Sequence, residues 1–161
     1  VKGRFKSLLI SSDGEKYSPE GIEEALVEKS PYIDQVMLYN NQCTTTTALI
    51  VPNRDSLRRY LKEKGMKAES VEGRTTALQL IENELARFKK GGEFQGMFPE
   101  RWLPSSFAVL AEPFTEQNQM INSTMKMVRP KIEKAYKERI DYIYTSEGKA
   151  TLNQQNIDSI F

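Results

Sequence analysis

Residues 33–51 read IDQVMLYNNQCTTTTALIV, which contains two β-rich runs around which the rest of the fold can be placed. The runs, 33–39 and 45–51, are rich in β-branched and apolar residues, a composition typical of strands. Between them, Asn40, Asn41 and Gln42 supply polar side chains of the kind that favour turns. We therefore predict a hairpin or a close antiparallel pair of strands here.

Helix signals lie on both sides of this pair. Ser18, Pro19 and Glu20 combine a capping hydroxyl, a proline at the first helical position and an early acid, which predicts a helix that ends near residue 30. Asn53 is expected to cap a helix that closes at Gly65. Apolar periodicity and β-rich composition predict further helices at 74–90, from 130 onward and at 153–161, and short strands at 5–10 and 107–110.

This order of elements predicts an α+β fold. We expect a small mixed or antiparallel sheet of about three main strands, plus a short N-terminal strand pair, with helices flanking it. The segment 112–124 is polar and is expected to be mostly irregular.

The composition excludes several classes of protein. The chain has 161 residues, 39% hydrophobic and 28% charged, as expected for a globular domain with its own core. It has no histidine and a single cysteine, Cys43, so this chain cannot supply an imidazole base, an internal disulfide or a metal site built from those residues. The net charge of +1 argues against broad attraction to nucleic acid. No segment approaches the ~20 apolar residues of a membrane span.

No secretion signal is expected from the N-terminal sequence. Val1 is followed by no apolar leader, and the chain lacks an initiator methionine. We therefore expect a cytoplasmic protein and a chain that is part of a longer polypeptide.

Three segments carry a more specific pattern. Residues 3–10 read GRFKSLLI, residues 14–23 read GEKYSPEGIE, and residues 122–132 read NSTMKMVRPKI. In this order they resemble the C-terminal domain of the adenylate-forming ligases, the superfamily of acyl-CoA synthetases, adenylation domains and firefly luciferase. The resemblance frames residues 1 to about 133, most of the chain.

Within that superfamily the chain is most similar to the long-chain fatty acid–CoA ligases. The lysine follows Thr124 and Met125, close to the Thr-x-Lys form of that branch. The segment 53–104 is longer than in many relatives, which implies a helical insertion within a single domain spanning 1–161. Ser123 and Val128 depart from the branch, which often has proline and a basic residue at these positions.

The resemblance implies that Lys126 is the catalytic lysine. In such ligases a carboxylate attacks the α-phosphate of ATP, and a cation placed beside the transferring group lowers the barrier. Lysine suits this role because it is a compact charge on a flexible stem. Arg129, three residues later, is expected to form an ion pair within the domain. The alternative is that Lys126 is an ordinary solvated lysine.

The resemblance also implies four further site residues. Arg4 would contact the ribose hydroxyls of the nucleotide, since a guanidinium offers five rigid donors, and Lys16 would also bind the nucleotide. Lys6 would be the hinge about which the domain rotates between two poses. Gly14 would line the coenzyme A channel, where a side chain would obstruct the thiol arm. The alternatives are a surface arginine, a polar residue on a strand edge and a plain turn glycine.

Together these residues imply the lid domain of an ATP-dependent long-chain fatty acyl-CoA ligase. The enzyme would convert a carboxylate and ATP to acyl-AMP and pyrophosphate, and then to acyl-CoA and AMP. ATP, Mg²⁺ and coenzyme A would be bound mainly by an N-terminal adenylation domain of the same chain, so the isolated domain should be inactive. No metal site, transmembrane segment or nucleic-acid partner is expected here, and peripheral membrane association of the full enzyme stays open. The alternative function is a non-catalytic interaction module.

Overall fold

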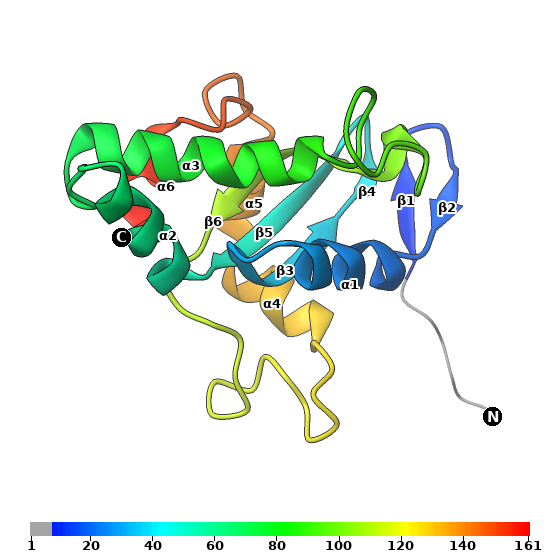
Figure 1. Ribbon diagram of the computed structural model, residues 1–161. Coiled ribbons are helices and arrows are strands. Elements are labelled where there is room, and N and C mark those ends of the chain that lie inside the picture. The colour runs from blue at the N-terminus through cyan, green and yellow to red at the C-terminus, as the bar shows by residue number, and fades with distance from the viewer. Residues whose placement is uncertain (1–7) are drawn as a thin grey trace.

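The two runs on either side of Asn40 form the predicted antiparallel pair (Figure 1). In this computed structural model, which describes residues 8–161, β3 (Ile33–Tyr39) pairs with β5 (Thr46–Pro52) so that Val36 lies opposite Ile50. β6 (Pro104–Val109) joins the other edge of β5 in the parallel direction, giving the strand order β3-β5-β6. Arg4 and Lys6 lie outside the described residues.

A second, smaller sheet has the strand order β2-β1-β4. β1 (Leu9–Ser11) and β2 (Lys16–Tyr17) are antiparallel, and β4 (Asn41–Cys43) runs parallel to β1. Asn41 and Gln42, whose side chains were predicted to favour a turn, belong to β4. The Ser12 N–H, directly after β1, donates to the Cys43 carbonyl at 3.0 Å. This segment therefore pairs with β1 as a third strand.

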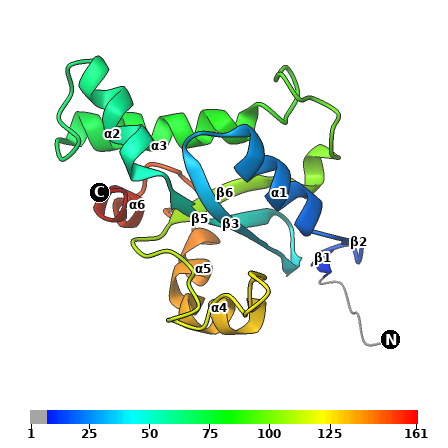
Figure 2. The ribbon, with the colours of Figure 1, turned by 60° about the horizontal axis from the view of Figure 1, so that its bottom comes forward.

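Helices cover both faces of the main sheet (Figure 2). Alternate residues of β3 point to opposite sides, and the cluster containing Leu38 also holds Ile22 of α1 (Glu20–Lys29), whereas Met37 packs with Ile132 of α4 (Arg129–Ala135). The remaining helices are α2 (Arg54–Glu63) and α3 (Val71–Ala86) on the α1 side, α5 (Lys137–Ile143) on the α4 side, the single-turn 3₁₀ helix η1 (Glu100–Trp102), and α6 (Gln154–Ser159) beside β6. The predicted α+β class is confirmed.

Several predicted helix ends differ from the observed ones. Pro19, not Ser18, is the N-cap of α1, because the Ser18 hydroxyl donates to the Glu20 carboxylate instead. α3 begins earlier than the predicted 74–90, since the Ser70 side chain caps it, and it ends at Ala86. The helix expected from residue 130 is divided into α4 and α5 at Tyr136.

The segment 53–104 packs onto the main sheet. Leu57 and Leu61 of α2 and Leu78 of α3 are buried in the same cluster as Ile50 of β5. The Asn53 side chain caps α2 by accepting from the Ser56 N–H at 3.0 Å, as predicted. Among residues 8–161, none of the helices has the length and apolar character that a membrane crossing requires.

Candidate functional site

Lys126 lies in a short loop before α4, and its side chain is exposed. The loop is closed by its own polar groups. The Asn122 Oδ1 atom accepts from the Thr124 N–H at 2.9 Å, the Thr124 hydroxyl at 2.7 Å and the Lys126 N–H at 3.0 Å. The Asn122 N–H donates to the Lys126 carbonyl at 2.9 Å. The backbone of Lys126 is therefore bonded on both sides, while its side chain stays accessible.

The base of this loop is attached to a hydrophobic core. Ile121 and Met127 form an antiparallel bridge, and the Val128 N–H donates to the Met120 carbonyl at 2.8 Å. Ile121 is buried in the cluster that also contains Ile132 of α4. Because the two ends of the loop are bonded to each other and packed on the core, Lys126 projects from a fixed base.

A groove of about 1190 Å³ runs between α1 and the Lys126 loop. Lys126 lines one wall, whereas Glu20, Glu24 and Glu28 of α1 line the other. A phosphate group approaching Lys126 inside this groove would meet those carboxylates, which repel it. The groove is therefore poorly suited to hold a nucleotide within this domain alone.

The ion pair expected for Arg129 is confirmed. Its guanidinium forms two hydrogen bonds with the Glu23 carboxylate of α1, and both side chains are largely buried. Arg129 is the first residue of α4. The pair therefore links the segment just after Lys126 to α1.

Gly14 and Lys16 lie on the β1–β2 hairpin. Gly14 has a φ of +88°, as its position in a tight turn predicts, and a Cβ atom added to it would meet nothing within 4 Å. The turn is closed by the Ser11 N–H, which donates to the Glu15 carbonyl at 2.9 Å. Lys16 is exposed on β2. Both predicted residues are thus on an accessible edge of the smaller sheet.

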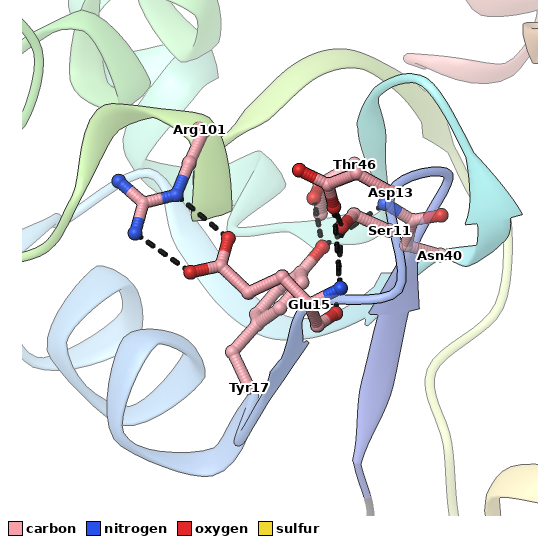
Figure 3. Close-up of polar contacts among 7 residues, drawn as sticks. All are labelled: Ser11, Asp13, Glu15, Tyr17, Asn40, Thr46 and Arg101. Atoms are coloured by element: carbon pink, nitrogen blue, oxygen red, sulfur yellow. Dashed lines mark hydrogen bonds and ion pairs between the residues drawn. The ribbon is translucent and has the colours of Figure 1, made fainter.

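This hairpin is fastened to the body of the domain by Glu15 and Tyr17. The Glu15 carboxylate accepts from Arg101 Nε at 2.6 Å and Nη2 at 2.7 Å, and these bonds lower the pKa of Glu15. The buried Tyr17 ring stacks on Trp102 with ring centroids 5.3 Å apart. The Tyr17 hydroxyl forms a hydrogen bond with the Thr46 hydroxyl (Figure 3).

Of the predicted site residues that the structure describes, Lys126 does not share a groove with Gly14 or Lys16. The groove that Lys126 lines includes Ser18 and the start of α1 but neither Gly14 nor Lys16. Lys126 and Gly14 therefore belong to separate parts of the described surface.

Sequence reasoning missed the partners that hold these surfaces. Glu23 lies three residues before Leu26, and both are buried. An acidic residue on the apolar face of the predicted α1 helix was therefore the signal that Glu23 has a buried partner. Arg101 carried no comparable signal, because its partner Glu15 is 86 residues away along the chain.

Comparisons with known proteins show what this chain is similar to. Residues 6–83 match the family model of the AMP-binding enzyme C-terminal domain. The chain is 28% identical over 145 residues to a chloroplastic long-chain-fatty-acid–[acyl-carrier-protein] ligase of Arabidopsis thaliana, covering 90% of this chain and 18% of that protein. It is 27% identical over 152 residues to long chain acyl-CoA synthetase 8 of the same plant, covering 89% of this chain and 20% of the relative.

A solved structure is similar as well. The adenylation domain of a carboxylate reductase from Mycobacterium chelonae superposes with a TM-score of 0.67 at 27% identity, over 86% of this chain and 19% of that one. The chain thus spans about a fifth of the length of the relatives it matches.

Proposed function

We propose that this chain, whose residues 6–83 match the AMP-binding enzyme C-terminal domain, is the mobile lid of a larger ligase that activates carboxylates as acyl-adenylates. The observation that carries the proposal is the Lys126 loop, whose backbone is tied down by Asn122 while the lysine side chain is accessible. Lys126 then acts on ATP bound in another part of the polypeptide.

The proposed role of Lys126 is electrostatic. When the carboxylate attacks the α-phosphate, negative charge gathers on the transferring phosphoryl group and on the departing pyrophosphate. An ammonium group fixed beside these oxygens stabilises the transition state more than the ground state. Rotation of the lid delivers this charge and then withdraws it.

The second pose brings the Gly14 turn to the active site. The exposed turn leaves an open surface along which a phosphopantetheine arm reaches the acyl-adenylate, and Lys16 beside it contacts the nucleotide. Arg4 and Lys6 keep their proposed roles at the ribose and the hinge. In this scheme the whole described domain, with its helical segment 53–104, rotates as one unit about Lys6.

We propose a long-chain fatty acid as substrate and coenzyme A as acceptor. The named activities of two relatives support fatty acyl activation. As part of the same proposal, Mg²⁺ is bound by the adenylation domain together with the phosphates of ATP. Because one relative is described as an acyl-carrier-protein ligase, coenzyme A and a carrier protein should be assayed side by side. A cytoplasmic location stays a prediction, since that relative is chloroplastic.

The test separates the two half-reactions in the parent enzyme. Lys126→Ala should abolish carboxylate-dependent exchange of pyrophosphate into ATP, yet leave thioester formation from supplied acyl-AMP largely intact. Lys134→Ala is the matched control, because Lys134 is an exposed lysine of α4. If Lys126→Ala exchanges pyrophosphate into ATP at the wild-type rate, Lys126 is not the catalytic lysine.

A second pair of variants tests the Gly14 surface. Gly14→Leu should block thioester formation while sparing adenylation, because its bulk enters the path of the thiol arm. Gly14→Ala has the same backbone strain with less bulk, and Gly91→Leu has similar strain at φ +85° on another open turn. The proposal fails at this point if Gly14→Leu forms thioester as fast as Gly91→Leu.

A further inference from the structure

The ion pair between Glu23 and Arg129 is unusual in this chain because both partners are nearly buried. The Glu23 side chain is 6% exposed and that of Arg129 is 11% exposed. Arg129 Nη1 donates to Glu23 Oε2 at 2.9 Å, and Nη2 donates to Oε1. The Leu38 N–H of β3 also donates to Glu23 Oε2, at 2.7 Å. One carboxylate therefore joins α1, β3 and the start of α4.

Burial makes this arrangement costly to maintain. Removal from water raises the pKa of the Glu23 carboxyl, and the hydrogen bonds from Arg129 and Leu38 oppose that effect only in part. A buried ion pair often contributes little net stability, and its best-attested use is to fix one geometry. The forked guanidinium suits that use, since it aligns two parallel bonds with a carboxylate.

The geometry that the pair fixes is that of the Lys126 loop. The other hydrogen bonds of residues 122–128 stay within residues 120–132. In the described part of the chain, Arg129 thus supplies the polar attachment between this loop and α1, three residues from Lys126. Without it, the loop would keep its internal shape but could pivot against α1.

We propose that Glu23 and Arg129 are positioning residues that set the direction in which Lys126 leaves the domain. The inference rests on the proposed function and adds two residues to it. Neither side chain touches the nucleotide. They act through the loop, because a displacement of about 1 Å at a catalytic group can reduce a rate by ~10²-fold.

Arg129→Lys is the informative variant. It keeps a positive charge beside Glu23 but cannot form the bidentate hydrogen bond. The loop should therefore become less rigidly attached, while the buried Glu23 carboxylate keeps a charged partner. In the parent enzyme we expect kcat for adenylation to fall by roughly 10–100-fold, with a smaller change in KM for ATP. Thioester formation from supplied acyl-AMP should stay within about twofold of wild type, because Lys126 takes no part in it. Glu23→Gln should show the same selective loss.

The matched control is Arg58→Lys. Arg58 pairs with Glu69 at 2.7 Å, but both side chains are well exposed and distant from the loop in sequence, so neither half-reaction should change. Selective loss of adenylation in Arg129→Lys and Glu23→Gln supports the inference. Equal loss of both half-reactions, as from general unfolding, or loss of neither, overturns it. If Lys126→Ala itself adenylates normally, the proposed function fails; if only the Arg129 and Glu23 variants adenylate normally, this inference alone fails.

Discussion

Asn156→Ala tests whether the last helix is firmly attached to the rest of the domain. Asn156 is fully buried, and its Oδ1 accepts from the Val109 N–H at 2.9 Å and from Arg139 Nη2 at 3.1 Å. Its Nδ2 donates to the Phe107 and Thr151 carbonyls, both at 3.0 Å. β6 is an edge strand, and this one amide bonds to the backbone groups that a further strand would otherwise satisfy.

The cost of the substitution follows from the groups left behind. Alanine removes the partner of one buried N–H and two buried carbonyls, and each unsatisfied group costs ~1–3 kcal/mol. Their sum is ~3–9 kcal/mol, and water entering the vacated space recovers part of it. We expect a loss of ~3–5 kcal/mol, a large share of the ~5–15 kcal/mol that stabilises a typical domain.

Urea denaturation of the 161-residue chain, followed by the fluorescence of Trp102, measures this loss. Gln154→Ala is the control in the same helix, because Gln154 is exposed and its amide bonds only to Asp158, so the change should stay below ~0.5 kcal/mol. A loss below ~1 kcal/mol for Asn156→Ala would refute the reasoning. α6 would then be a loosely attached tail instead of part of the unit that carries Lys126.

Two further substitutions probe the β1–β2 hairpin. Tyr17→Phe removes a buried hydroxyl that bonds to Thr46 and accepts from Asn40 Nδ2 at 3.1 Å, so urea denaturation should show a loss of ~1–2 kcal/mol; an unchanged midpoint would contradict this. Arg101→Gln should raise the pKa of Glu15 toward 4.5, as measured by carboxyl NMR titration. Since Arg101 lowers that pKa, the stabilisation is present above pH 4.5 and is lost as the pH falls, and the variant should lack this pH dependence. An unchanged Glu15 titration would rule out the ion pair.

Local chemistry predicted much of the fold. The strands β3 and β5 follow from runs of β-branched and apolar residues, and the Asn53 cap follows from a side chain that bonds three residues away. The error at residues 41–43 arose where distant segments meet. Residues 41–43 form a strand because β1 lies beside them, and no pattern within the segment shows that neighbour.

The candidate site divides in the same way. The positive φ of Gly14 was predictable from a tight turn, whereas Lys126 was selected by resemblance, since one exposed lysine looks like another in a single sequence. An ion pair of Arg129 was predicted, but its partner Glu23 was not identified, because the two residues are 106 positions apart. Such a pair can be identified only from the structure, in which α1 and α4 pack against the same sheet. Arg4 and Lys6 stay predictions, because they lie outside the described residues.

The most direct measurement is the accessibility of the Lys126 amine in the parent enzyme. The protein would be treated briefly with an amine-acylating reagent, and modification at Lys126 and Lys134 would be compared by mass spectrometry. If a swinging lid brings this amine to the nucleotide, a non-hydrolysable acyl-adenylate analogue should slow modification of Lys126 several-fold. Added coenzyme A should restore it, and Lys134 should not change. Equal reactivity of Lys126 in every state would contradict the account.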